Sequence, residues 1–142
     1  MPRRPLLSGL VALLIATGAS AHDDAHLDTI ASPHGGQQRM VGAYHFELVV
    51  TPATLQIYVT DHASNPTAAE KASATAIVLS GKSRQTVTLA PKGGNLLEGT
   101  GNFDPTQPVK AVVTIQFPDQ DALQARFDTA KRHAPAPANS SM

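Results

Sequence analysis

The chain contains no cysteine and no tryptophan, and its aromatic rings come from only four Phe and two Tyr. Without cysteine there is no disulfide, no thiolate metal site and no cysteine nucleophile. So few aromatic residues leave little surface on which sugars or bases could stack. Net charge is lacking as well, because 11 Lys and Arg balance 11 Asp and Glu. A chain without a basic excess is not expected to bind nucleic acid or an anionic membrane, since both attract basic patches.

The first 21 residues have the composition of a secretory signal peptide. Arg3 and Arg4 precede an apolar run over residues 6–18, which is followed by the small residues Ala19-Ser20-Ala21. This order is typical of a cleaved signal, and cleavage is expected after Ala21. The apolar run is shorter than the roughly 20 residues that span a bilayer, which disfavours a retained anchor. We therefore predict an exported, periplasmic protein that begins at His22 and does not insert into a membrane.

Apolar and polar residues alternate through the middle of the chain. From Tyr44 to Val50 every second residue is apolar, whereas His45 and Glu47 occupy alternate positions. A period of two is typical of a strand with one buried face. Thr51-Pro52-Ala53-Thr54 suits a hairpin turn into a second, antiparallel strand. Further strands are expected at residues 74–80, 85–90, 96–100, 109–117 and 123–127, with Gly-, Pro- and Asn-rich turns between them.

About seven short strands of this kind predict an all-β fold, a single Ig-like antiparallel β-sandwich over residues 41–128. Residues 22–40 are small and polar, and they are predicted to form a flexible arm that carries histidines. Residues 129–142 are rich in Ala, Pro and Ser and are predicted to be a disordered tail. The mature chain has room for one modest core and not for two domains.

Motifs for catalysis are lacking in this sequence. No serine lies in a Gly-x-Ser-x-Gly turn, and no spacing orients a histidine against a serine as in a catalytic triad. Neither Gly35-Gly36 nor Gly93-Gly94 leads into a helical pattern, so neither is expected to bind phosphate. We therefore predict that the protein is not an enzyme.

Histidine is the residue type that stands out. Five of the six histidines lie in the first third of the mature chain, beside several carboxylates. Imidazole and carboxylate without sulfur suit zinc, nickel, cobalt or Cu(II). Met40 and Met142 are too few and too far apart in the sequence for a thioether site that would favour Cu(I).

One candidate metal site lies at the mature N-terminus. After cleavage, the α-amine and the imidazole of His22 would chelate a Cu(II) or Ni(II) ion, and His26 follows closely. The alternative is that this acidic and histidine-bearing segment is only a solvated leader.

A second candidate site lies on the first hairpin. His45 and Glu47 point to the same side of their strand, and counting from the turn places His45 opposite Thr60 and near Asp61 and His62. Gly35 allows the chain to bend after His34 and to return over the sheet edge. His34, His45, Glu47 and Asp61 are thus candidate ligands of one site. The alternative is that His45 and Glu47 belong to the solvated face of the strand.

Several stretches resemble a group of small periplasmic proteins and adaptor-linked domains that are encoded with heavy-metal efflux systems of the resistance-nodulation-division type. The resemblance covers residues 34–127, and it departs from the group's expected Asp-Gly turn at residues 62–66. It implies a periplasmic accessory of heavy-metal homeostasis, with polar positions of the group matched by His34, His45, Glu47 and Asp61. The similar stretches are His34-Gly35-Gly36, Tyr44-His45-Phe46-Glu47-Leu48-Val49, residues 55–62, residues 89–99 and Ala125-Arg126-Phe127.

These observations predict a non-catalytic protein of heavy-metal resistance that binds or buffers a divalent transition metal and passes it to a periplasmic efflux adaptor. Zinc, nickel, cobalt and Cu(II) all remain open as the ion. The alternative is a periplasmic protein-interaction module that docks on an efflux adaptor or another envelope protein through an edge strand and binds no metal.

Overall fold

The computed structural model describes residues 20–131, with side chains from Asp24 onward. The predicted signal peptide, except for Ser20 and Ala21, lies outside the described residues, and so does the tail after Lys131. Helix α1 (Ser20–Leu27) opens the described part, and a short 3-10 helix (Thr129–Lys131) closes it. No helix in this part of the chain is long and apolar enough to cross a membrane.

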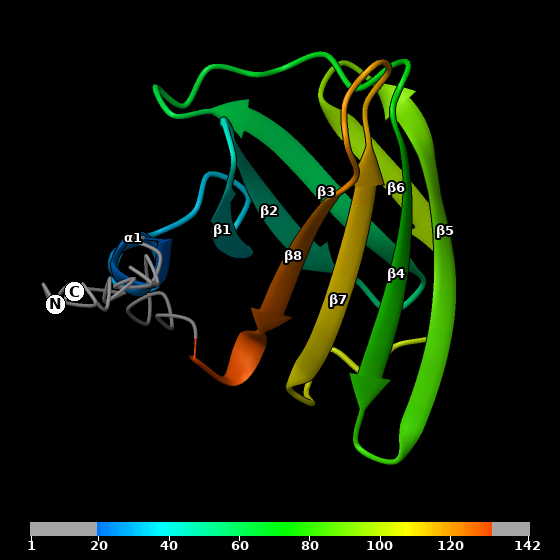
Figure 1. Cartoon of the computed structure of the whole chain (residues 1–142). Helices are drawn as coiled ribbons and strands as arrows, with labels where there is room; N and C mark the ends of the chain where they lie inside the picture. The colour runs from blue at the N-terminus through cyan, green and yellow to red at the C-terminus, as the bar shows by residue number, and fades with distance from the viewer. Residues whose placement is uncertain (1–19, 132–142) are drawn as a thin grey trace, which may run out of the picture.

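Eight antiparallel strands form one continuous sheet, in the order β1-β2-β3-β6-β5-β4-β7-β8. The sheet curls until its two edge strands, β1 and β8, approach each other, as Figure 1 shows. The all-β prediction is confirmed, but the seven-stranded Ig-like sandwich is not. The strands are β1 (Gln37–Val41), β2 (Tyr44–Val50), β3 (Thr54–Asp61), β4 (Ser73–Ser80), β5 (Ser83–Gly93), β6 (Leu96–Thr100), β7 (Val109–Gln116) and β8 (Leu123–Asp128).

The length of β5 explains why the sheet is continuous and does not split into two layers. Residues 83–89 of this eleven-residue strand pair with β4, whereas Ala90, Pro91 and Gly93 pair with β6. The strand thus changes partner between Leu89 and Ala90, and its register with β6 shifts between Pro91 and Gly93. One strand therefore belongs to both halves of the sheet, which a sandwich of two separate sheets would not allow.

The periodic stretches of the sequence coincide with β2 to β8. The first hairpin is antiparallel as predicted, and its register places His45 opposite Thr60. Gly93 and Gly94 have φ angles of 121° and 56°, so they supply the predicted turn between β5 and β6. The inward positions form a single core that includes Phe46, Leu48, Ile57, Val78, Leu97, Val113, Ile115 and Phe127.

The stretch predicted as a flexible arm, residues 22–40, differs from the structure, which places α1 and β1 there. The sequence of β1 is polar, yet Gln37 is 2% exposed and Arg39 is 7% exposed. Gln37 lies opposite Leu48, and Arg39 lies opposite Phe46, so both side chains point into the barrel. The alternation of apolar and polar residues could not predict this strand, because polar side chains fill its inward positions.

Side chains of β1 close the seam between the two sheet edges. The Gln37 amide nitrogen donates to Asp128 O at 2.8 Å, and its oxygen accepts from Asp128 N at 2.9 Å. Arg39 Nε donates to Arg126 O at 3.0 Å, and its Nη1 lies 2.7 Å from Asp28 Oδ1. These bonds satisfy the backbone of β8 in place of a strand ladder.

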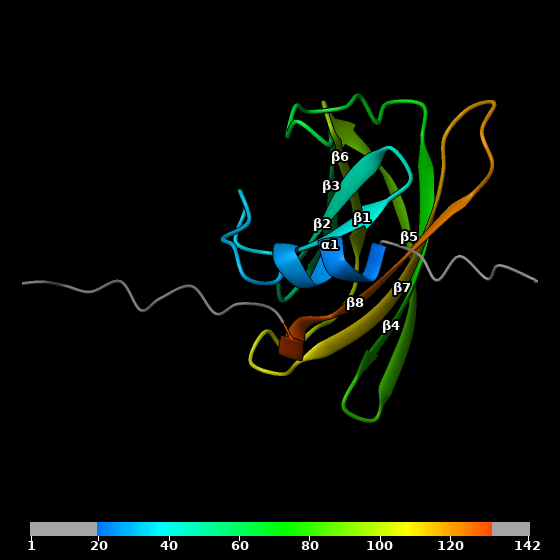
Figure 2. The ribbon, with the colours of Figure 1, turned by 60° about the vertical axis from the view of Figure 1, so that its left-hand side comes forward.

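Helix α1 packs against β1, beside this seam (Figure 2). Its Leu27 is 6% exposed, and Asp24 Oδ1 accepts the Met40 amide at 2.8 Å on the open edge of β1. The tail prediction also differs at its start, because Thr129 belongs to the 3-10 helix and its hydroxyl accepts Val109 N. Both ends of the described chain are thus tied to the barrel edges.

Replacing Gln37 by leucine is expected to lower the free energy of unfolding by about 2 kcal/mol, because it leaves Asp128 N and O without their partner. The matched control is Gln38→Leu, on the outer face of the same strand, where the side chain makes no hydrogen bond within the described residues. Urea denaturation of both variants measures the difference. Equal stability of the two variants would show that the amide does not hold the seam.

Candidate functional site

The candidate site lies on the outer face of the β1–β2–β3 part of the sheet, where a carboxylate is buried. Glu47 alternates with the core residues of β2 and therefore points away from the core. Its side chain is nevertheless only 5% exposed. The segment before β1 covers it, because the chain turns back over β2 at residues 33–36.

Glu47 holds this covering segment through four hydrogen-bond contacts. Its carboxylate accepts the His34 amide at 2.9 and 3.2 Å and the Gly36 amide at 2.9 Å. Its Oε1 also lies 2.8 Å from His34 Nδ1. The bend that brings these groups together uses Gly35 with φ 73°, as the sequence predicted. The predicted return of His34 over the sheet edge is therefore confirmed.

Two contacts fix the His34 ring. It stacks on Tyr58 with a centroid distance of 3.6 Å and an interplanar angle of 6°. A neutral imidazole that donates from Nδ1 to a carboxylate keeps its lone pair on Nε2. Nε2 has no hydrogen-bond partner among the described residues, and the His34 side chain is 42% exposed. The imidazole is thus oriented at one nitrogen and open at the other.

A pocket of about 180 Å³ adjoins this ring. It lies between the His34 segment and the loop after β3, and Pro33 and Pro66 contribute to its walls. Its lining is rich in groups with oxygen atoms that could complete the coordination of an ion or accept a hydrogen bond. These are Gln38, Thr60, Ser64 and Asn95. Glu47 also lines the pocket, but its carboxylate oxygens are engaged by His34 and Gly36.

Asp61 shapes the wall of this pocket and does not point its carboxylate at His34. Its Oδ1 accepts the amides of Ala63 and Asn65 at 2.9 Å, and its Oδ2 accepts Asn65 Nδ2 at 3.2 Å. The hydrogen bond from the Asn65 amide lowers the pKa of Asp61 below its ordinary 3.8. These contacts hold the loop, in which Ser64 has a φ of 66°. Asp61 therefore acts on the site through the loop conformation.

His45 is placed with another histidine and not with His34. It is 7% exposed, and its ring stacks on His62 with a centroid distance of 5.2 Å. His62 Nε2 in turn donates to Gly42 O at 3.0 Å. The hairpin count correctly placed His45 opposite Thr60 and near His62.

The second candidate site was predicted to use His34, His45, Glu47 and Asp61. Of these four residues, the structure brings His34 and Glu47 into contact. Within residues 20–131 no three His, Asp or Glu side chains gather as a metal-binding group. His26 is exposed on α1, and the side chain of His22 lies outside the described set. A closed site of four protein ligands is therefore not assembled from these residues.

Sequence reasoning missed Tyr58, which supports the His34 ring. Tyr58 lies directly opposite Glu47 in the hairpin register, so the same count that placed His45 could have found it. It also missed Gln38, because β1 was not predicted. The lining from residues 60–66 could not be foreseen, because it depends on the loop conformation that Asp61 sets.

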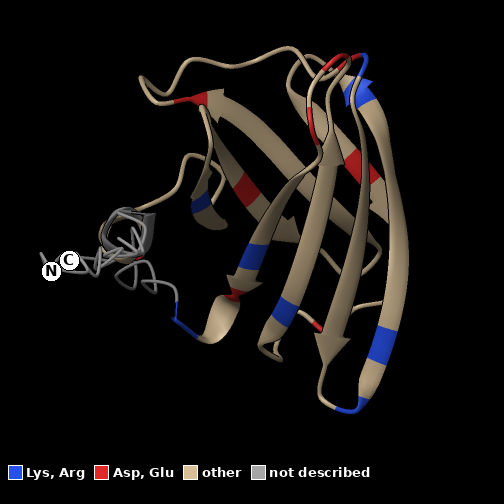
Figure 3. Ribbon diagram, viewed as in Figure 1, with Lys and Arg blue, Asp and Glu red and all other residues tan. Residues whose placement is uncertain are grey.

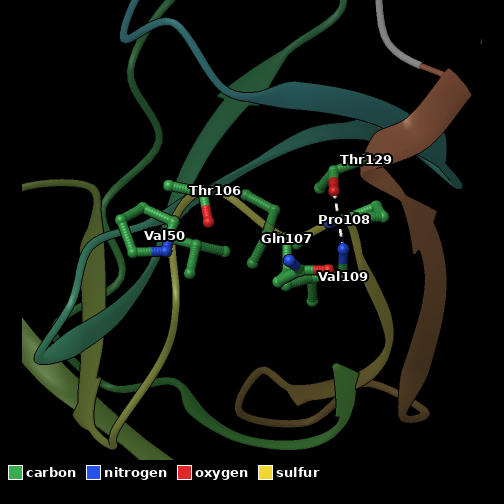
Figure 4. A pocket seen from close by; sticks show the side chains of 8 residues that line it. Val50, Thr106, Gln107, Pro108, Val109 and Thr129 are labelled. Atoms are coloured by element: carbon green, nitrogen blue, oxygen red, sulfur yellow. Dashed lines mark hydrogen bonds between the residues drawn. The ribbon is translucent and has the colours of Figure 1, made fainter. Parts of the chain in front are cut away.

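A second pocket, of about 280 Å³, lies at one end of the barrel (Figure 4). Apolar side chains such as Val50 and Pro108 line it. The hydroxyl of Thr129 is engaged by Val109 N, and that of Thr106 by Asp104. Gln107 also lines this pocket, but no histidine or carboxylate does. It therefore offers a metal ion fewer donors than the pocket beside His34.

Compared with models of protein families, with curated proteins and with solved structures, the chain has no match. The site must therefore be interpreted from its own geometry.

Proposed function

We propose that this protein is an exported, non-catalytic accessory of heavy-metal homeostasis that binds a divalent transition metal through His34. The observation that carries the proposal is the 2.8 Å contact between His34 Nδ1 and the buried carboxylate of Glu47. Histidines that ligate metals almost always donate their other ring N–H to a carboxylate, carbonyl or water, which fixes the tautomer and raises the basicity of the ligating nitrogen. Glu47 then orients the ligand and is not itself the ligand.

The donor set determines the kind of ion and the strength of binding. An imidazole with side-chain oxygens and no sulfur suits zinc, nickel, cobalt or Cu(II). At this pocket the described residues offer one strong donor, Nε2 of His34, so water or another protein would fill the remaining coordination positions. Such a site suits transient binding and transfer better than storage. Transfer to a periplasmic efflux adaptor is the route that the resemblance implies, and we include it in the proposal.

The order of the chain supports the exported location. The described hydrogen bonds between the N-terminal segment and the barrel use Asp24 and Asp28, which both follow the expected cleavage site at Ala21. Removal of residues 1–21 would therefore leave these contacts in place.

Docking through an edge strand, the alternative function, has less support. The open edges of β1 and β8 are linked to each other through Gln37 and Arg39, and α1 packs against β1 beside this seam. An added strand would have to displace these contacts, which normally protect an edge.

The test is a calorimetric titration of the untagged chain from His22 with Zn(II), Cu(II), Ni(II) and Co(II). We expect His34→Ala to weaken binding of the preferred ion by tenfold or more, and Glu47→Gln to weaken it about tenfold, because outer-shell partners of ligating histidines contribute 10–100-fold in affinity. His62→Ala is the matched control, since its Nε2 is engaged with Gly42 O. Asp61→Asn should also retain the affinity if Asp61 acts only on the loop.

Two outcomes would contradict the proposal. Binding that survives in His34→Ala but is lost in His22→Ala would place the ion on the N-terminal amine and not on the barrel. No binding of any of the four ions would favour a protein without a metal site.

The affinity should depend on pH. A ligating imidazole must be neutral, so binding should weaken as the pH falls through about 6.5, where histidine ordinarily becomes protonated. Titrations at pH 7.5 and pH 5 measure this effect. An equal affinity at both values would exclude an imidazole ligand.

A further inference from the structure

The outer face of β4 and β7 leaves apolar side chains uncovered. Ile77 is 37% exposed and Leu79 is 46% exposed, and they are two of the three large hydrophobic side chains that are exposed among the described residues. They lie two positions apart on β4 and so point to the same side. Val112 of β7, directly opposite Ile77, extends the apolar surface. A hollow of about 290 Å³ lies at this place, with all three residues in its lining.

Cationic residues surround this apolar centre. The sheet register places Arg126 next to Val112, and it places Lys110 and Arg84 on the two sides of Leu79. Figure 3 shows the blue segments of β5, β7 and β8 on this half of the sheet, together with Lys82 in the β4–β5 turn. Asp128, opposite Lys110, is the one acidic residue that lines the hollow.

These cations have no ion-pair partners in the described part of the chain. The salt bridges there join His34 to Glu47, Arg39 to Asp28, and Lys92 to Glu98. The uncovered apolar centre and its cationic rim are thus both available to a partner, although the chain as a whole has no net charge.

We propose that this face, called here the β4–β7 face (Ile77, Leu79, Val112, Arg84, Lys110 and Arg126), binds a protein segment in which acidic and apolar side chains alternate. Apolar side chains of the segment would fill the hollow, which supplies binding free energy by removing apolar surface from water. Its carboxylates would meet the three cations of the rim, which select the partner and speed its association. The face lies on a different half of the sheet from His34, so the proposal is independent of the metal site.

Charge disfavours the other occupants. A second copy of the same face would bring like charges together. Residues 132–142 contain Arg132 and no acidic residue, so they do not complement the rim. Basic clusters that bind anionic lipids carry about four to eight Lys or Arg. This face has three, with Lys82 in the adjoining turn as a fourth, and it includes the acidic Asp128. The hollow decides between the two occupants, because apolar side chains of a protein segment would fill it and a flat bilayer surface would not.

The test uses fluorescence anisotropy with a short labelled peptide of alternating glutamate and leucine, added to the untagged protein at low salt. Matched peptides have glutamine or lysine in place of glutamate. We expect the glutamate peptide to bind at least about tenfold more tightly than the other two, because like charges repel and uncharged side chains are not attracted. The double variants Lys110→Glu with Arg126→Glu, and Ile77→Ser with Leu79→Ser, should each lose about tenfold or more.

Lys92→Glu is the charge-reversal control, because Lys92 is 65% exposed and lies outside the face. Thermal melts establish that the variants remain folded, which their exposed positions favour. Equal peptide affinity in the Lys110/Arg126 variant and the parent would overturn the proposal. So would binding of phosphatidylglycerol vesicles without binding of the peptide, or self-association in the ultracentrifuge that the same variants abolish.

Discussion

Replacing Glu47 by alanine should lower the free energy of unfolding by about 3 kcal/mol, the cost of removing a buried acceptor that satisfies several donors. The variant leaves the amides of His34 and Gly36 without their acceptor and frees the His34 ring at Nδ1. Because this carboxylate attaches residues 33–36 to β2, its loss should also release the segment that covers the sheet. Urea denaturation gives the stability, and hydrogen exchange of the Gly36 amide reports the local release.

The controls for Glu47 separate charge from hydrogen bonding. Glu47→Gln keeps one acceptor oxygen and should cost less than the alanine variant. Glu98→Ala removes a carboxylate whose side chain is 18% exposed and which accepts from Gln56 Nε2 at 2.8 Å. We expect it to cost no more than about 1 kcal/mol, as for other partly exposed contacts. If Glu47→Ala costs no more than Glu98→Ala, the buried carboxylate does not hold the covering segment.

The strands that the sequence predicted are those whose inward positions are apolar. In β2, the inward residues Phe46 and Leu48 alternate with His45 and Glu47, which are also buried but lie on the outer face. Short turns with Pro52 or Gly93-Gly94 then make neighbouring strands antiparallel. These signals are local, so they can be read from a few consecutive residues.

The first strand and the closure of the sheet could not be predicted in this way. Gln37 is buried because its amide pairs with the backbone of Asp128, which is 91 positions away in the chain. Neither residue indicates by itself that the other will be its neighbour. Residues 20–27 form a helix, and among its described side chains, those of residues 24–27, one apolar side chain is buried, that of Leu27. A segment with so little buried apolar surface resembles a solvated leader in its sequence.

The candidate site shows the same division between local and distant signals. The turn at Gly35 and the register of His45 follow from short-range rules, and both are found in the structure. The burial of Glu47 on the outer face depends on the segment at residues 33–36 that covers it. The alternation of apolar and polar residues along a strand says nothing about the path of that segment. For this reason the sequence predicted Glu47 as a metal ligand, whereas its contact with His34 Nδ1 gives it an orienting role in our proposal.

Replacing Gly36 by alanine should have an effect at least as large as the loss of Glu47. A Cβ at this position would lie 2.1 Å from the carbonyl oxygen of Leu48, and the β2 backbone cannot move away without breaking its pairing with β3. We expect a loss of about 3 kcal/mol or more, the upper range for overpacking. The displaced segment would carry His34 away from Glu47, so metal binding should weaken as much as in His34→Ala.

The neighbouring glycine provides the matched control for this variant. Gly35 has a φ of 73°, and a Cβ there would meet nothing within 4 Å, so Gly35→Ala should cost only about 1–2 kcal/mol of backbone strain. Denaturation curves and calorimetric titrations of both variants measure stability and affinity on the same proteins. If Gly36→Ala is no less stable than Gly35→Ala, the close approach to Leu48 does not constrain the segment. If Gly36→Ala is less stable but binds metal with the parent's affinity, displacing the His34 segment does not affect metal binding. The contact between His34 and Glu47 is then not needed for the site.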